Sequence, residues 1–315
     1  MTSTASTFPI GVPRPPPYAV VFGPRANCTL NICPLQYSVY GYRPSLAASY
    51  TFITLNALAG LVHAYLGFRW KQWWFMGCML VGTVNAVIGY VGRVMMYWNP
   101  FNFSAFMLQI ICITTGPVYY CAAIYITLAL SIQNLNPHIS RLPPRLLYTI
   151  FIPADIVSLV LQAAGGALST SSSGSSQVGI DLALAGMSFQ VFTMVVFCGL
   201  LGDYLFRYYR RQEGGAVVVV GGGVKSGRGL GLFFGFIGLA LVLTLVRCAY
   251  RLAELHEGYS GHLVKEEGLF IGLEGVMVLM AVYCLMIGHP GFVFKKGAKE
   301  YELGGQSEQE LRELK

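Results

Sequence analysis

Apolar residues fall into seven long blocks along the chain, separated by short stretches that are richer in polar, charged and proline residues. Each block has about the 20 predominantly apolar residues that an α-helix needs to cross a bilayer. The blocks cover residues 45–67, 73–96, 104–132, 146–168, 178–201, 229–252 and 268–288. This pattern predicts an all-α membrane protein, a seven-transmembrane helix bundle. One helical domain would occupy residues 45–289, between an N-terminal tail of residues 1–44 and a C-terminal tail of residues 290–315.

The composition agrees with this class. Hydrophobic residues make up 55% of the chain and charged residues only 11%. Ordinary soluble domains carry roughly 25% charged residues, which keep their surfaces hydrated. A soluble domain of 315 residues would need far more charge than this chain has, so we exclude that class.

Lys and Arg are concentrated in alternate connections between the blocks, which sets the expected orientation. The connections around Asn99 and at residues 169–177 contain no Lys or Arg. The connections 68–72, 133–145 and 202–228 and the C-terminal tail carry the basic residues Arg69, Lys71, Arg141, Arg145, Arg207, Arg210, Arg211, Lys225, Arg228, Lys295, Lys296 and Lys299. The connection before the last block also holds a Lys, but among four acidic residues: Lys265 with Glu254, Glu257, Glu266 and Glu267. Because Lys and Arg are retained in cytosolic loops, this asymmetry predicts an extracellular N-terminus and a cytosolic C-terminus. The net charge of +7 then reflects basic residues at the cytosolic membrane surface, where they face anionic lipids. We therefore expect no nucleic-acid binding.

Two features of the N-terminal tail fit an extracellular position. Asn27-Cys28-Thr29 is a glycosylation sequon, and Cys28 and Cys33 lie close together in a compartment that favours disulfides. We favour a disulfide between these cysteines over free thiols or pairing with another chain. No His or further Cys stands near them at a metal-ligand spacing, so we expect no metal site. A second sequon at Asn102 lies too near the membrane for us to expect its modification.

Polar residues inside the blocks are the candidates for a functional site, because each is costly in the bilayer and needs a partner. These candidates are Asn85, Arg93, Gln109, Asp155, Gln162, Gln190, Arg247, Arg251, Glu254 and Glu274. With a rise of 1.5 Å per residue, most of them lie in the outer half of the expected bundle. The sequence therefore predicts a polar cavity in the outer-leaflet half, closed toward the cytosol and reaching Arg93, Gln162 and Glu274.

Two interpretations of the charged residues remain open. In one, Arg93, Arg247 and Arg251 neutralise three acids and only hold helices together. The acids would then be Asp155, Glu254 and Glu274. In the other, some of these groups contact a ligand. Both interpretations require the side chains to face the bundle interior.

Neighbouring helices suggest a more specific contact. The sixth and seventh blocks are joined by a short connection, so we expect Arg247 or Arg251 to pair with Glu254 or Glu274. We expect a packing role for His63, which is isolated near the inner end of its block. Small residues allow close helix contact, which we expect at Gly89, Gly92, Gly165 and Gly166.

Several motifs carry a resemblance to a known family. They are Trp73-Trp74-Phe75-Met76-Gly77, Gly89-Tyr90-Val91-Gly92-Arg93, the segment 155–166 that begins Asp155-Ile156-Val157-Ser158, Arg247-x-x-Tyr250-Arg251-x-x-Glu254, and His289-Pro290-Gly291. Together they resemble the fungal RTA-like family, also called the lipid-translocating exporter family. The chain departs from the family in having Ala86 where relatives carry an acidic residue, four positions before Tyr90. Asn85 is the residue that we expect to replace that acid in part beside Arg93.

The resemblance implies a multi-pass protein of the fungal plasma membrane that moves amphipathic compounds or confers resistance to them. Sphingoid bases, sterol-like compounds and porphyrin-like compounds are the implied ligand classes. No nucleotide-binding motif is visible, so movement would be facilitated or coupled to a gradient. We expect the lipid head in the outer-half cavity, with Phe106, Met107, Tyr119 and Tyr120 lining a path for the tail.

Other seven-helix classes lack their diagnostic residues here. A G-protein-coupled receptor would show an acidic-Arg-Tyr motif where this chain has Ser131-Ile132-Gln133. A retinal protein needs a Lys in block 268–288, and a zinc hydrolase needs several intramembrane His where only His63 is present. We therefore expect no enzyme activity and no cofactor, only membrane lipids or similar amphipathic partners. A lipid sensor that binds without moving its ligand remains the alternative.

Overall fold

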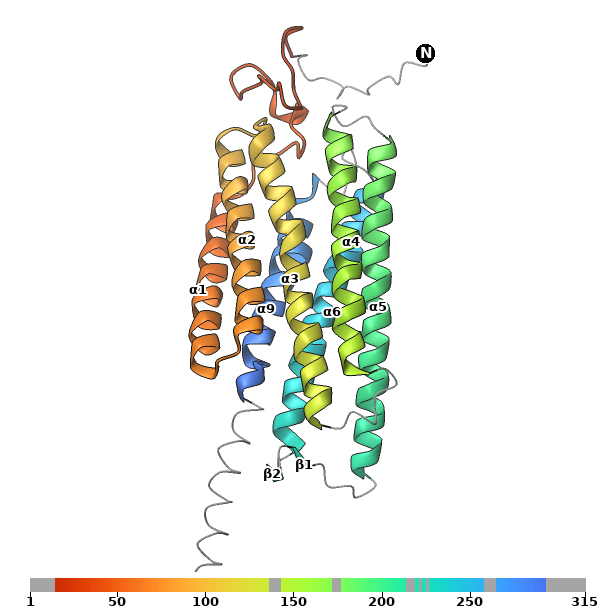
Figure 1. Cartoon of the computed structure of the whole chain (residues 1–315). Helices are drawn as coiled ribbons and strands as arrows, with labels where there is room; N and C mark the ends of the chain where they lie inside the picture. The colour runs from red at the N-terminus through yellow and green to blue at the C-terminus, as the bar shows by residue number, and fades with distance from the viewer. Residues whose placement is uncertain are drawn as a thin grey trace, which may run out of the picture.

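A computed structural model of the chain describes residues 15–135, 143–171, 177–213, 219–220, 223–224, 227–257 and 265–292. These residues form a bundle of long, roughly parallel and antiparallel helices (Figure 1). The first six are α1 (Leu46–Trp70), α2 (Trp73–Trp98), α3 (Phe103–Leu135), α4 (Pro144–Ser171), α5 (Gln177–Glu213) and α6 (Gly227–Glu257). The last span joins α8 (Glu267–Leu269), the π-helical η3 (Phe270–Val276) and α9 (Met277–Ile287).

Seven helices among the described residues are long and apolar enough to cross a membrane, which confirms the predicted fold class. Two short elements complete the fold: the 3-10 helix η1 (Leu35–Tyr37) and an antiparallel pair of β1 (Val219–Val220) with β2 (Gly223–Val224). The basic residues Arg141, Lys225, Lys295, Lys296 and Lys299 lie outside the described residues, as do residues 1–14 and the C-terminal tail from residue 293.

Two helices differ from the apolar blocks in ways the pattern did not indicate. Helix α5 continues past residue 201 to Glu213, because Tyr204 and Tyr208 remain buried against α6. The Tyr204 ring lies 6.5 Å from that of Phe234. The seventh span is not uniformly α-helical, since η3 widens it to a π-helix around Glu274. Such π segments are rare and frequently occur at functional sites.

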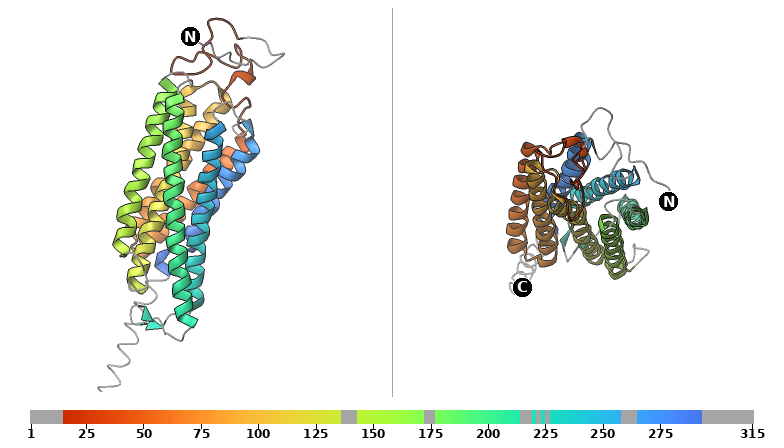
Figure 2. Two further views of the ribbon diagram at one scale, coloured as in Figure 1. Left: turned by 90° about the vertical axis from the view of Figure 1, so that its right-hand side faces the viewer. Right: turned by 90° about the horizontal axis from the view of Figure 1, so that it is seen from above.

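The helices form two groups that meet along α3 and α6. Helix α2 packs between α1 and α3, while α4 and α5 form a hairpin on the other side (Figures 1 and 2). The hairpin is tight because glycines bring the two backbones together: a Cβ on Gly165 would lie 2.5 Å from the Ala183 nitrogen. Gly89 and Gly92 play the same part between α2 and α3. These three glycines occupy the close-packing positions that the sequence suggested.

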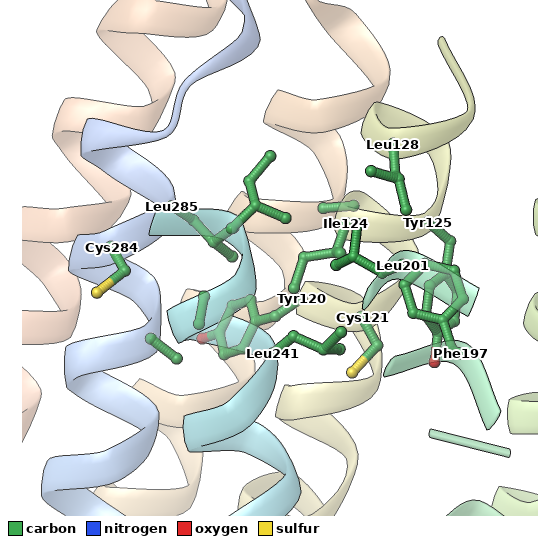
Figure 3. Packing of buried hydrophobic residues seen from close by; sticks show 14 of the residues in the cluster. Tyr120, Cys121, Ile124, Tyr125, Leu128, Phe197, Leu201, Leu241, Cys284 and Leu285 are labelled. Carbon is green, nitrogen blue, oxygen red and sulfur yellow. The ribbon is translucent and has the colours of Figure 1, made fainter. Parts of the chain in front are cut away.

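The main apolar core joins α3, α5, α6 and α9, as Figure 3 shows. Tyr125 and Phe197 pack with their ring centroids 4.3 Å apart, and Phe151 lies 5.1 Å from Phe197. His63 is fully buried near this core, and its Nε2 lies 3.3 Å from the Val282 carbonyl oxygen. His63 therefore has the packing role expected for it.

The described part of the N-terminal segment, residues 15–45, packs on one end of the bundle, which we call the capped end (Figure 1). Phe22 makes edge contacts with Phe103 and Phe106 at the start of α3. Cys28 and Cys33 form a disulfide that is buried against Phe101. The segment thus adds its own small core to the ends of α2 and α3.

The Asn102 side chain has a local structural role at the start of α3. Its side-chain oxygen accepts a hydrogen bond of 3.1 Å from the Ala105 nitrogen at the start of α3. Such a contact caps the helix by satisfying one of its free N–H groups.

Candidate functional site

Arg93 is held at the capped end by groups from two distant parts of the chain, the N-terminal segment and the start of the last span. It is 1% exposed, and its Nη2 donates to Glu267 Oε1 at 3.0 Å and to the Tyr42 hydroxyl at 3.2 Å. The same Glu267 oxygen accepts a 2.7 Å hydrogen bond from the Ser45 nitrogen, just before α1. Burial raises the pKa of the Tyr42 hydroxyl, so this group stays neutral. Glu267 therefore supplies the negative charge beside Arg93.

The sequence predicts that Asn85 takes the place of a missing acid beside Arg93, and this prediction is wrong. The Asn85 amide instead donates a 2.6 Å hydrogen bond to Thr115 of α3. The carboxylate comes from Glu267, which was not among the candidate site residues because it lies just outside the seventh apolar block. Its one sequence signal is its position at the start of that span, since acidic residues are favoured in the first turn of a helix.

Arg247 and Arg251 form a second charged network, between α6 and the last span. Arg247 pairs with Glu274, its Nε donating to Oε1 at 2.9 Å, and both residues are 1% exposed. Arg251 pairs with Glu254 at 2.5 Å and also lies 3.4 Å from the second oxygen of Glu274. The expected pairing across these helices is present. It joins α6 to the last span through buried charges.

A proline of α3 connects this network to a third helix. Pro117 has no N–H, so it cannot donate to the carbonyl of Ile113 one turn earlier. That carbonyl instead accepts a 3.0 Å hydrogen bond from Arg247 Nη2. Arg251 likewise reaches α3, donating to Thr114 Oγ1 at 3.3 Å. The two arginines thus tie α3, α6 and the last span together.

Asp155 lies apart from these networks, contrary to the suggestion that an arginine neutralises it. Its side chain is buried on α4, and no ion pair to it is present among the described residues. Thr193 of α5 donates to its Oδ1 at the long distance of 3.5 Å, and Oδ2 has no hydrogen-bond partner in the described part of the chain. The arginines are already occupied by Glu267, Glu254 and Glu274, which explains why none reaches α4.

The remaining candidates are amides that link a helix to another part of the fold. Gln162 of α4 donates a 2.9 Å hydrogen bond to Gln190 of α5. Gln109 of α3 donates a 3.0 Å hydrogen bond to the Tyr40 hydroxyl in the N-terminal segment. Asn27 lies in that segment, and its side chain accepts from the Val20 nitrogen at 2.7 Å, which stabilises a turn. All ten intramembrane candidates are therefore at least partly buried and contact other polar groups.

A cavity of about 330 Å³ lies between α3, α4, α5 and α6 near the capped end. Its polar lining residues are Tyr40, Thr114, Thr115, Gln162, Arg251 and Glu254. The other lining residues are apolar or glycine: Phe106, Met107, Ile110, Ile111, Leu159, Ala163, Gly166, Ala167, Ala183, Met187 and Leu255. A cavity lined by both charged and apolar side chains suits an amphipathic molecule.

The extent of this cavity differs from the expected one. Gln162 lines it, but Arg93 and Glu274 do not. Phe106 and Met107 line it, whereas Tyr119 and Tyr120 do not, because they lie on other faces of α3. A separate space of about 10 Å³ touches Glu274 and Tyr120 and has room for about one water molecule.

Gly166 also differs from its expected role. It lines the cavity, and a Cβ placed on it would meet no atom within 4 Å. It is therefore not a close-packing position like its neighbour Gly165. No cluster of His, Cys, Asp or Glu able to hold a metal ion occurs in the described residues.

Comparison with known proteins gives one family and several relatives. Residues 79–297 match the family model described as "RTA1 like protein". The sphingoid long-chain base transporter RSB1 of Saccharomyces cerevisiae (strain Lalvin EC1118) is 32% identical over 287 residues, covering 82% of this chain and 75% of that protein. Protein RTA1 of the same species is 24% identical over 285 residues, covering 81% of this chain and 85% of that protein. No solved structure matches the chain.

Proposed function

Because this chain belongs to the RTA1-like family, we propose that it binds amphipathic lipids in the cavity at its capped end and moves them across the membrane. The chain is an integral multi-pass membrane protein, and its similarity to a sphingoid long-chain base transporter supports lipid transport at the level of the family. We further propose that the head group of the lipid binds in this cavity, and that the protein acts in the plasma membrane without enzymatic chemistry.

The single observation that carries the proposal is the mixed lining of the cavity, where charged and polar groups occur among a larger number of apolar side chains. Arg251 and Glu254 provide both signs of charge, and Arg251 also contacts the Thr114 hydroxyl. Gln162 adds an amide whose Oε1 has no hydrogen-bond partner among the described residues. This mixture of groups suits a head group that carries an amine and hydroxyls better than it suits a simple anion.

The size and position of the cavity indicate how the rest of the lipid is accommodated. A volume of about 330 Å³ is at the lower end of the range for ligand pockets, so it holds a head group and the beginning of a chain. Ile111 of α3 and Ala163 and Ala167 of α4 line the cavity and are also exposed on the bundle surface. A tail could pass between α3 and α4 at this point and remain in the bilayer.

Orientation decides which leaflet the cavity serves. The alternation of basic residues favours an extracellular capped end, in which case the cavity lies in the outer-leaflet half. The described apolar core of α3, α5, α6 and α9 fills the bundle farther from this end. A transporter of this form would have to rearrange the core to open toward the other leaflet, using an ion gradient or the lipid gradient itself.

A substitution at Gly166 tests the proposal, because it fills the cavity without disturbing helix contacts. Gly166→Leu adds a side chain that projects into the cavity, where a Cβ meets no other atom. Gly199→Leu is the matched control: this glycine lies on α5, is exposed, and a Cβ placed on it would likewise meet no atom within 4 Å. Each protein would be reconstituted in liposomes with a fluorescent sphingoid base.

We expect the original protein and Gly199→Leu to accelerate movement of the lipid between leaflets, and Gly166→Leu to abolish both movement and binding. Equal transport by Gly166→Leu and Gly199→Leu would contradict the proposed cavity. Binding without any movement in the original protein would instead identify a lipid sensor, the alternative function.

A further inference from the structure

Asp155 lies directly beneath the cavity on the same face of α4. Leu159 and Gln162, which line the cavity, follow it by one and two turns toward the capped end. With a rise of 1.5 Å per residue, the Asp155 backbone is about 6 Å from that of Leu159 and about 10 Å from that of Gln162 along the helix axis. The carboxyl is thus close to the bound head group that we propose, but not part of the cavity wall.

Polar groups of α4 and α5 lie between the two places. Gln162 at the cavity wall donates to the Gln190 side-chain oxygen at 2.9 Å, and the Thr193 hydroxyl donates to the Gln190 backbone carbonyl oxygen at 2.9 Å. The same Thr193 hydroxyl lies 3.5 Å from Asp155 Oδ1. Gln190 Nε2 and Asp155 Oδ2 are buried without a hydrogen-bond partner among the described residues. One donor and one acceptor between the cavity and Asp155 are therefore free.

The groups that face Asp155 from its neighbouring helices provide no positive charge. Helix α3 contributes Tyr125 and Cys121, and α6 contributes Cys248. Helix α5 contributes the Thr193 hydroxyl, which does not titrate. Arg247, the residue before Cys248 on α6, is already bound to Glu274 and to the Ile113 carbonyl. An ionised Asp155 would therefore be a buried charge without a counterion, which the interior of a membrane protein strongly disfavours.

We propose that Asp155 is a proton-binding site linked to the cavity: its carboxyl is protonated while the cavity is empty and ionises when a cationic head group enters. This inference rests on the proposed function, because it names the ion whose binding changes with the lipid. The O–H bond of the carboxyl breaks, and the proton leaves for bulk water by way of the cavity. The positive charge of the head group, one to two helical turns away, replaces the proton as the charge that balances the carboxylate. No covalent bond to the lipid forms.

This exchange makes lipid binding depend on pH with a definite sign. Each cation that binds releases up to one proton, so its affinity rises with pH by up to about tenfold per pH unit across the range in which Asp155 titrates. A neutral lipid of the same chain length releases none. Proton release on binding would also let a proton gradient drive the lipid from one side of the membrane to the other.

Two probes separate this effect from titration of the lipid itself. N,N,N-trimethylsphinganine is permanently cationic, and N-acetylsphinganine is neutral with the same long chain. Calorimetric titration of the purified protein in nanodiscs, in two buffers of different ionisation enthalpy at one pH, counts the protons released per lipid bound. The variants are Asp155→Asn, which resembles the protonated side chain, and Asp181→Asn, the same change at an exposed carboxyl of α5.

We expect the original protein and Asp181→Asn to release a proton with the cationic probe and none with the neutral one. Asp155→Asn should release none with either probe, and its affinity for the cation should not change with pH. Infrared difference spectra of the original protein provide a measurement that does not depend on the variant folding: the C=O band of a protonated carboxylic acid should disappear when the cation binds.

The possible failures are distinguishable. A cationic probe that binds without proton release, and without loss of that infrared band, would overturn the role of Asp155 and leave the proposed lipid binding intact. Failure of sphinganine and of both probes to bind would overturn the proposed function, and this inference with it.

Discussion

Arg93 of α2 and Glu267 at the start of α8 form an ion pair of 3.0 Å although 174 residues separate them along the chain. Arg93 is 1% exposed, whereas the Glu267 side chain is 26% exposed. The pair therefore joins a buried cation to an anion at the edge of the bundle. Since Glu267 also holds the Ser45 nitrogen, it fixes α1, α2 and the last span relative to one another.

Removing the charge of Glu267 should loosen this end of the bundle. Glu267→Gln leaves Arg93 buried without its anion, and we expect a loss of about 2 kcal/mol in stability, in the range for hydrogen bonds to charged groups. Thermal unfolding of the purified protein measures the loss. Asp181→Asn, which removes the charge of an exposed carboxylate on α5, should have little effect. Equal melting temperatures for the two variants would show that Glu267 does not stabilise Arg93.

The two acids of the second network should differ in importance. Glu274→Gln deprives the buried Arg247 of its anion and Arg251 of its second contact, so we expect a loss of about 3–5 kcal/mol, as for a broken buried ion pair. Glu254→Gln should cost less, because Arg251 retains Glu274. Chemical or thermal unfolding of both variants under one set of conditions gives the comparison. A greater loss for Glu254→Gln would contradict the arrangement described for this network.

Adjacent glycines of α4 should respond in opposite ways to the same substitution. Gly165→Ala places a Cβ 2.5 Å from the Ala183 nitrogen, so the α4–α5 hairpin must separate, at a cost of about 1–3 kcal/mol. Gly166→Ala meets no atom within 4 Å, and the higher helix propensity of Ala should stabilise it by up to about 1 kcal/mol. Melting temperatures of the two variants decide the matter, and a loss at position 166 equal to that at position 165 would contradict the open wall of the cavity.

Glycosylation at Asn27 would establish which side of the membrane carries the capped end. Thr29→Ala destroys the sequon and leaves the Asn27 side chain to hold its turn with Val20. If the N-terminus is extracellular, we expect the original protein to carry a glycan that an amidase removes and that Thr29→Ala lacks. Labelling of an epitope added at the N-terminus in intact cells is a second measurement. An epitope that reacts only in permeabilised cells would reverse the orientation.

The length of the apolar blocks determined the seven spans, because a backbone inside a bilayer must satisfy its own hydrogen bonds and a helix does so within one segment. The same physics required Arg93, Asp155, Arg247 and Glu274 to face inward, and all four are buried. The connection between the sixth and seventh spans was short enough to indicate that Arg247 or Arg251 meets Glu274.

The choice of partner elsewhere depended on the tertiary structure. Arg93 meets Glu267 and not Asp155, since the packing of α2 beside α1 and the last span directs it away from α4. Gly165 and Gly166 are identical in sequence terms, yet one faces the α5 backbone and the other faces the cavity. A helical pattern specifies which residues share a face, but only the packing of separate helices decides what that face meets.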